Sequence, residues 1–220
     1  MATVTEIREM ARTLGLWNTA KGRIDITDET VSNLDYIAGI FRTEIEMRKV
    51  KKEITLRKES RLPDKLFDKS KITQGLIWQL QKTEQFDFKN EIQSFVIVGA
   101  CSTGKTSLAC ELGAYALSKG AKVQYIGLED MLLAIRNQNA RWGRILKADM
   151  IIIDDVFYIT PTDEELIAFY KAVTFLSEIR SLVIVTNRPL SEWSGMGADK
   201  HLAETLQKRL MASAQLMHLK

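Results

Sequence analysis

A phosphate-binding loop is the strongest chemical signal in the sequence. Four apolar residues, 95–98, precede the pattern Gly-x-x-x-x-Gly-Lys-Thr, which runs from Gly99 to Thr106. Glycine permits backbone angles that a Cβ would forbid, so the N–H groups of such a loop surround phosphate oxygens at the N-terminus of the next helix. We expect Lys105 to reach the β- and γ-phosphates and Thr106 to bind Mg²⁺. The predicted nucleotide-binding residues are Gly99, Ala100, Cys101, Ser102, Thr103, Gly104, Lys105, Thr106 and Ser107.

A pair of carboxylates follows a second apolar segment, 150–153. Its Asp154-Asp155 ending has the form of a Walker B strand, in which the first carboxylate holds Mg²⁺. The second carboxylate can polarise the attacking water as a general base. In the alternative interpretation the two aspartates only cap the following loop.

Cys101 is an unusual residue inside a phosphate loop. We interpret it as a small space-filling residue or as the site of an oxidation switch.

Two further polar residues are candidates for the same chemistry. Asn187 follows the apolar segment 182–185 and could hydrogen-bond the attacking water or the γ-phosphate. Alternatively, Thr186-Asn187 only begins a turn before Pro189. In a ring of subunits, Arg209 could stabilise transition-state charge on a neighbour's γ-phosphate. It could equally be a surface arginine, and the residues alone leave the two interpretations open.

A basic segment runs from Arg48 to Lys71. It holds ten basic and four acidic residues, a net of +6 in a chain whose net charge is only +3. A local excess of this kind suggests a polyanion partner. A solvated helix face is the alternative. The predicted DNA contacts are Arg48, Lys49, Lys51, Lys52, Arg57 and Lys58.

The elements that must position these residues alternate between strand and helix from residue 95 onward. Apolar segments at 95–98, 123–126, 150–153 and 182–185 predict strands. Helices are expected after the loop to Ser118, over 129–147, from Thr162, and over 198–212 as the last element. This alternation predicts an α/β fold with a parallel sheet covered by helices on both faces. Ligands bind at the carboxyl ends of such strands, so the loop, Asp154-Asp155 and Asn187 are expected to meet there.

The first 60 residues are predicted to form a small all-helical module. Thr3 and Glu6 form a capping-box signature for a short amphipathic helix that ends near Gly22. A longer helix is expected to start near Thr27 or Asp28. Its apolar stripe contains Val31, Leu34, Ile37, Phe41, Ile45, Val50 and Ile54. Residues 61–90 are interpreted as a connector, with a helix at 72–80, and residues 91–220 as the nucleotide domain.

Composition places the chain among ordinary soluble proteins. Hydrophobic residues make up 45% of the 220 residues and charged residues 27%. No apolar run approaches the ~18 residues that span a bilayer, and the charged N-terminus does not read as a secretory signal. The two cysteines read as reduced thiols. We therefore expect a cytoplasmic protein without membrane contact.

Several stretches together resemble a known family. They are Leu14-Gly-Leu-Trp-Asn18, the basic helix before Arg61-Leu-Pro63, Gly104 to Ala109, Ile153 to Val156, Thr186-Asn-Arg-Pro-Leu-Ser-Glu-Trp193 and the region of Arg209. The chain is similar to the IstB-type ATPases of insertion sequences, which are kin of the DnaC-type helicase loaders within the AAA+ class. The resemblance implies a P-loop AAA+ core with ATP and Mg²⁺ as cofactors, Asn187 as the sensor residue and Arg209 as the arginine finger. It also implies an ATPase that binds double-stranded DNA, assembles as a homo-oligomer and assists a transposase.

Two departures and two alternatives accompany this resemblance. Gly-Ala-Cys-Ser replaces the common Gly-Pro-Pro-Gly start of the loop, and no room is expected after Lys220 for a C-terminal lid domain. The main alternative is a helicase loader whose partners are a replicative helicase and single-stranded DNA, with the N-terminal module as a protein-docking element. A small-molecule kinase is a third possibility, although no arginine-rich lid is found.

Overall fold

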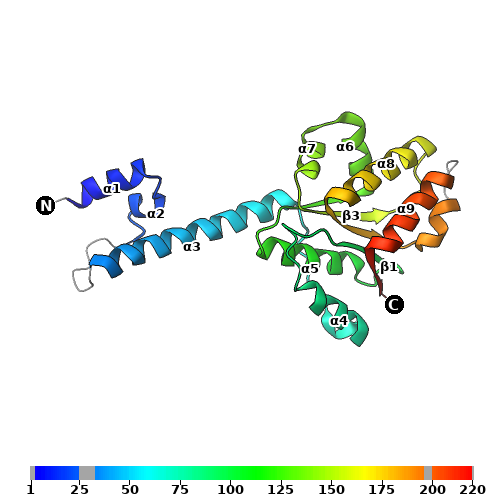
Figure 1. Ribbon diagram of the computed structural model, residues 1–220, viewed down its shortest axis with the longest axis horizontal. Coiled ribbons are helices and arrows are strands. Elements are labelled where there is room, and N and C mark those ends of the chain that lie inside the picture. The colour runs from blue at the N-terminus through cyan, green and yellow to red at the C-terminus, as the bar shows by residue number, and fades with distance from the viewer. Residues whose placement is uncertain (1–2, 25–32, 196–199, 220) are drawn as a thin grey trace. The chain divides into compact units, whose positions relative to one another are not determined.

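The computed structural model describes residues 3–24, 33–195 and 200–219 (Figure 1). The chain divides into two compact units, Met1–Thr55 and Leu56–Lys220. Three predicted features lie outside the described residues: the helix start at Thr27 or Asp28, Val31 of the apolar stripe, and the start of the last helix at Ala198.

The described part of the first unit contains α1 (Val4–Thr13), α2 (Trp17–Ala20) and most of α3 (Asn33–Ser60). The capping box is confirmed, because the Thr3 side chain accepts the Glu6 N–H while the Glu6 carboxylate accepts the Thr3 N–H. The prediction of one helix as far as Gly22 is wrong. Gly15 adopts a left-handed φ of +70°, and a left-handed residue ends a helix.

A buried carboxylate joins α2 to α3. Glu44 is 2% exposed and accepts hydrogen bonds from the Asn18 side chain, at 3.1 Å, and from the Thr19 N–H, at 2.8 Å. Burial by itself raises the pKa of this carboxyl, but the hydrogen bonds from Thr19 and Asn18 outweigh it and hold the pKa below its ordinary value. The apolar stripe predicted on α3 is exposed to solvent at Phe41, Ile45, Val50 and Ile54.

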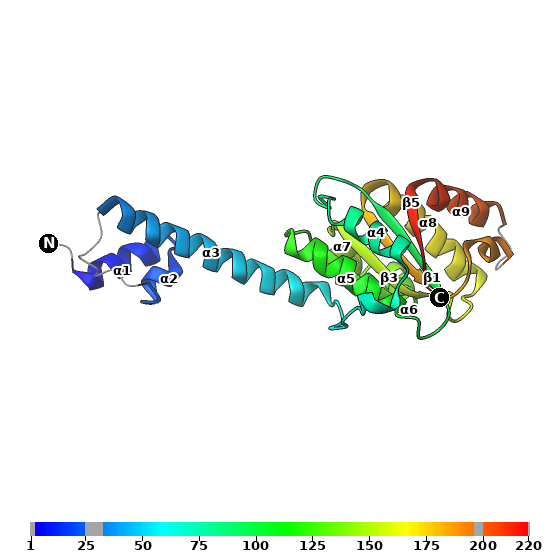
Figure 2. The same cartoon turned by 90° about the horizontal axis from the view of Figure 1, so that it is seen from below.

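The second unit is built on a sheet of five parallel strands. Their order is β2 (Val123–Gly127), β3 (Met150–Val156), β4 (Ser181–Thr186), β1 (Ser94–Gly99) and β5 (Ala214–Leu219). The parallel α/β fold and the four predicted strands are confirmed. The fifth strand was not predicted: after the last helix the chain pairs with β1, from Ser94 opposite Ala214 to Gly99 opposite Leu219 (Figure 2).

Helices cover both faces of this sheet (Figure 1). Alternate strand residues point to opposite faces, so Val96 and Ile153 join one apolar core while Phe95 and Ile152 join the other. α5 (Lys105–Ser118) packs on the second core with α4 (Gln74–Thr83). The first core is covered by α6 (Leu128–Asn137), α7 (Ala140–Leu146), α8 (Asp163–Ile179) and α9 (Lys200–Ser213).

The segment read as a connector contributes to the second unit's core. Leu62, Leu76, Leu80 and Phe88 are buried there against α5. The short 3₁₀ turn η1 (Lys69–Lys71) precedes α4, and η2 (Leu190–Gly195) lies between β4 and α9.

The single helix predicted over 129–147 is two helices. Gln138 has a left-handed φ of +46°, which ends α6. The Asn139 side chain then accepts the N–H groups of Arg141 and Trp142 and caps the start of α7.

Candidate functional site

The phosphate loop joins the end of β1 to the first turn of α5. Gly104 caps α5 with a φ of +91°, and Ser102 also has a positive φ, +64°. A Cβ on Gly99 would lie 2.5 Å from the carbonyl oxygen of Leu219, so only glycine fits beside β5. No side chain caps the N-terminus of α5. Its first-turn N–H groups and positive dipole end therefore suit an anion.

Lys105 folds over this loop. Its ammonium donates to the carbonyl of Ala100 at 2.6 Å, and the Thr103 hydroxyl donates to the same oxygen at 2.9 Å. These contacts hold the cation at the mouth of the loop, where a phosphate would accept from it.

Asp154 is held from two sides within the sheet. The Tyr125 hydroxyl of β2 donates to Oδ2 at 2.5 Å, and the Asp155 N–H donates to Oδ1 at 2.9 Å. Asp154 is only 2% exposed. Each carboxylate oxygen has a second lone pair, so the group can still take part in binding a cation.

Asp155 lies at an irregularity in the pairing of β3 with β4, between Ile153 and Val156. Its φ of +54° turns it out of the sheet, and it is exposed. Partial burial of its carboxyl raises the pKa and the charge of Asp154 raises it further, whereas Lys65 and Lys105 lower it. A raised pKa suits a carboxylate that accepts a proton from water.

Asn187 directly follows β4 and lines the same cleft as Lys105 and Asp155. The oxygen of its side chain is buried and has no hydrogen-bond partner among the described residues. A buried polar group without a partner costs about 1–3 kcal/mol, so it requires an explanation, and a role in the cleft is one. The neighbouring Thr186 hydroxyl is used internally, because it donates to the Val156 carbonyl and accepts the Arg188 N–H.

One cleft of about 520 Å³ brings most of these residues together. Its lining includes Asp155, Asn187, Lys105 and Thr106, as the sequence predicts for the carboxyl edge of the sheet. Lys65 and Tyr158 also line the cleft and were not predicted. The sequence places Lys65 only within the basic segment from Arg48 to Lys71. No spacing between residues indicates that it lies near the phosphate loop.

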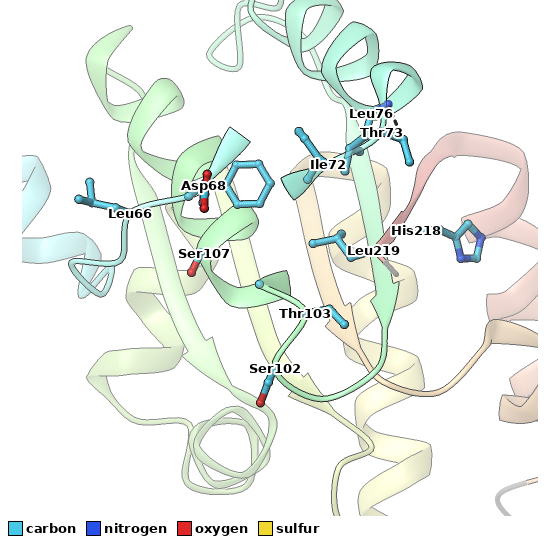
Figure 3. A pocket seen from close by; sticks show the side chains of 12 residues that line it. Leu66, Asp68, Ile72, Thr73, Leu76, Ser102, Thr103, Ser107, His218 and Leu219 are labelled. Atoms are coloured by element: carbon cyan, nitrogen blue, oxygen red, sulfur yellow. Dashed lines mark hydrogen bonds between the residues drawn. The ribbon is translucent and has the colours of Figure 1, made fainter. Parts of the chain in front are cut away.

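A smaller pocket of about 190 Å³ adjoins the loop on the side of β5. Figure 3 shows Ile72 and Leu219 directed toward this space, with Thr103 and Ser107 along its lower side. Phe67 and Leu76 add further apolar surface. The two hollows share Ser102, Gly104 and Ser107, so they adjoin each other along the loop.

Arg209 does not line this cleft. Its guanidinium pairs with Glu178 of α8 on the surface of the second unit.

The two cysteines are free thiols. Cys101 is exposed in the cleft and Cys110 is buried. Burial raises the pKa of Cys110 to about 11.

The residues predicted to bind DNA differ in their surroundings. Arg48 bonds the Gly15 carbonyl and lies 3.9 Å from Glu44, while Arg57 bonds Pro63 and Asp64. The remaining predicted contacts are exposed: Lys49, Lys51, Lys52 and Lys58.

The residues fit a magnesium ion that is bound mainly through a nucleotide. In the described part of the chain, no group of three or more His, Cys, Asp or Glu side chains could hold a metal. Mg²⁺ characteristically uses one or two carboxylates together with substrate phosphates and waters. Thr106 lines the cleft, whereas Asp154 is buried in β3 and does not line it, although the neighbouring Asp155 does. The Thr106 hydroxyl and the Asp154 carboxylate remain the predicted ligands.

A loop after β1, an acidic pair on β3 and a polar residue directly after the intervening β4 define a P-loop ATPase of the AAA+ class. Solved structures share the fold. The DnaC helicase loader superposes with a TM-score of 0.57 over 73% of this chain and 97% of that chain, at 18% identity. AMPPCP-bound DnaA from Aquifex aeolicus gives 0.53 over 68% of this chain and 48% of that chain, at 19% identity.

Sequence comparison then gives the family. The model of the IstB-like ATP binding protein family matches residues 11–220, so the chain belongs to this family. An insertion sequence IS21-like putative ATP-binding protein of Bacteroides fragilis is 27% identical over 97% of this chain and 87% of its own length. The IS5376 putative ATP-binding protein of Geobacillus stearothermophilus is 24% identical over 86% and 80%. For the IS21 protein of Pseudomonas aeruginosa, the match spans about half of the relative, 52%, at 25% identity.

None of the described helices has both the length and the apolar character required to cross a membrane.

Proposed function

We propose that this ATPase assists a transposase, with ATP binding and hydrolysis setting its assembly as an oligomer on target DNA. The observation that carries the catalytic part is the continuous cleft, in which the loop, Asp155 and Asn187 border one space. Membership of the IstB-like family supports the transposition part.

The residues of the cleft have separate roles in hydrolysis. The loop N–H groups and Lys105 bind the phosphates and neutralise charge that develops on them. Asp155 accepts a proton from the attacking water, and the unpartnered oxygen of Asn187 orients that water. When bound, Mg²⁺ neutralises phosphate charge as a Lewis acid. Thr106 and Asp154 would hold it.

The apolar pocket beside the loop receives the base of the nucleotide. Phe67, Ile72 and Leu219 offer it flat and aliphatic surface, and Ser102, Gly104 and Ser107 join this pocket to the phosphate cleft. The segment from Lys65 to Leu76 therefore serves both ends of one nucleotide.

DNA binding is assigned to the exposed lysines of the basic segment, Lys49, Lys51, Lys52 and Lys58. Phosphate contacts release counterions, so affinity falls with added salt at a slope of about −0.9 per phosphate neutralised. An ATP-dependent oligomer repeats the same surface along the duplex and gains avidity. Arg209 acts as an arginine finger on a neighbouring subunit's nucleotide once the oligomer forms.

The test is the ATPase rate alone and with duplex DNA, single-stranded DNA or a small phosphate acceptor. Stimulation by duplex DNA is expected. Preferential stimulation by single strands would favour a helicase loader with a replicative helicase as its partner. Transfer of phosphate to the acceptor would show a kinase and contradict the proposal.

A further inference from the structure

A second group of exposed cations lies on the ATPase unit, at the edge of the sheet formed by β2. Lys122 directly precedes β2, Arg144 lies in the last turn of α7, and Lys147 follows it. Together they border a shallow hollow of about 200 Å³. Its other lining residues are Leu56, Glu59, Val123, Gln124 and Ala148. The hollow shares no lining residue with the nucleotide cleft.

These three cations have no ion pair within the described residues. All three side chains are exposed, and the ion pairs between described residues of this unit use other side chains. Among the nearby carboxylates, Asp149 accepts the Lys122 N–H at 2.7 Å and Asp130 pairs with Arg141 at 3.4 Å. Glu59 is the only carboxylate in the lining of the hollow.

Two more arginines extend the positive surface. Burial lowers the pKa of Arg141, the charges of Arg61 and Arg144 lower it further, and the charge of Asp130 raises it, so Arg61 and Arg144 each lie close enough to Arg141 to act on its charge. Asp130 offsets the charge of Arg141, whereas Lys122, Arg144 and Lys147 have no ion pair within the described residues. A polyanion that contacts these three side chains supplies the missing negative charge.

A hydrogen bond holds the base of the hollow in place. The Gln124 side chain donates to the Glu59 carbonyl at 2.9 Å, which ties the end of α3 to β2. Leu56, Val123 and Ala148 are at most 7% exposed, so the hollow offers no exposed apolar side chain. Protein interfaces depend on buried aromatic and aliphatic contacts at their centre. The chemistry here is that of a phosphate-binding surface.

We propose that Lys122, Arg144 and Lys147, which we call the α7 basic patch, bind the sugar-phosphate backbone of duplex DNA, with Arg61 and Arg141 beside them. The inference rests on the proposed DNA-binding function and adds a contact surface on the ATPase unit. Since the patch contains no base-reading motif, its contribution is the same for all DNA sequences.

The test replaces Lys122, Arg144 and Lys147 by Gln in the full chain. The matched control replaces Lys82, Lys171 and Lys208, which are exposed on α4, α8 and α9, and makes the same change in net charge. Binding of a labelled duplex is measured by fluorescence anisotropy over a salt series with ATP present. The patch variant should bind at least about tenfold more weakly. Its salt slope should be flatter by about 2 to 3 units, because each lost contact removes about 0.9.

A charge-preserving variant separates loss of contact from loss of fold. Lys122→Arg, Arg144→Lys and Lys147→Arg together should retain duplex binding, and all three proteins should bind ATP like the wild type. Equal salt lines for the patch variant and its control overturn the inference. So does loss of duplex binding in the charge-preserving variant with ATP affinity unchanged.

The outcomes also separate this inference from the proposed function. If the wild-type chain fails to bind duplex DNA with ATP, both fall. If the wild type binds and only replacement of Lys49, Lys51, Lys52 and Lys58 weakens it, the proposed function stands and the α7 basic patch is rejected.

Discussion

At the residue scale, the hydrogen bond from Tyr125 to Asp154 sets the orientation of the buried carboxylate. Burial raises the pKa of Tyr125, and its bond to Asp154 raises it further, so the phenol keeps its proton and acts as a donor. With Oδ2 held by Tyr125 and Oδ1 by the Asp155 N–H, the carboxylate cannot rotate freely. The remaining lone pairs therefore keep a fixed direction for a cation.

Asp155→Asn should leave ATP affinity unchanged and slow hydrolysis by about 100-fold or more, the usual contribution of a general base. The reason is that Asp155 faces the cleft from its exposed position and can act on water, while the loop binds the phosphates. Isothermal titration with ATP and a phosphate-release assay measure the two effects. A turnover equal to that of the wild type would assign the base to another residue.

The sequence predicted the residues that belong to local motifs, and it missed those that depend on distant pairing. The loop, Asp155 and Asn187 each end a recognisable strand, so their meeting at one edge follows from a parallel sheet. Tyr125 reaches Asp154 only because β2 pairs with β3 in one register, Gly127 opposite Asp154. Lys65 reaches the cleft through the path of a non-repetitive segment, which spacing does not encode.

At the scale of elements, the segment between α3 and α4 lines the hollow in which we place the base of the nucleotide. Phe67 is half-buried, and its ring lies 3.9 Å from the position of a Cβ on Gly104. We predict that Phe67→Ala weakens ATP and ADP binding by about tenfold and leaves the affinity for inorganic triphosphate unchanged, because it removes apolar contact with the base. Lys105→Ala is the control and should weaken all three ligands. Competition against a fluorescent ATP analogue measures these affinities, and a loss of triphosphate binding in Phe67→Ala would contradict the base pocket.

The contact between α2 and α3 depends on the ionised form of Glu44. Glu44→Gln should destabilise this contact by about 1–3 kcal/mol at neutral pH, since charged hydrogen bonds to Thr19 and Asn18 are lost. The folded-state pKa of Glu44 is lowered, so its stabilisation is present above the ordinary value of 4.5 and is lost as pH falls through the lowered pKa.

Hydrogen exchange of residues 17–20 in both proteins measures the difference. Exchange should be faster in Glu44→Gln at pH 7, and the gap between the proteins should close in acid. Equal protection at pH 7 would remove Glu44 from the stabilising contacts of this unit.

β5 illustrates why an element can be missed. Met217 and Leu219 are buried at a spacing of two, but Leu210, Ala214 and Met217 also fit the three- and four-residue spacing of the preceding helix. The strand is specified by pairing with β1, a distant part of the chain. The sequence predicts one helix over 129–147 for a related reason. Gln138 ends α6 in a left-handed conformation, and only a glycine at that position would have indicated such an end.

At the scale of the whole molecule, the role of Arg209 requires a second copy of the chain. In the single chain it pairs with Glu178 and does not line the cleft. We predict that Arg209→Ala and Lys105→Ala are each nearly inactive as ATPases, and that mixing them restores part of the activity. The mixed assembly contains sites with an intact loop from one subunit and an intact arginine from the next. Glu178→Ala is the control and should remain active. Failure of every mixing ratio to restore activity would make Arg209 a surface residue.

The pairing of β1 with β5 determines when the chain becomes able to bind nucleotide during its synthesis. Gly99 lies against Leu219, so the loop made early in translation gains its neighbouring strand only after residue 219 has left the ribosome. Until then β1 has an unpaired edge, and such edges are prone to association with other chains. A nascent chain stalled before β5 should therefore require chaperone protection and bind nucleotide poorly, however complete its phosphate-loop motif.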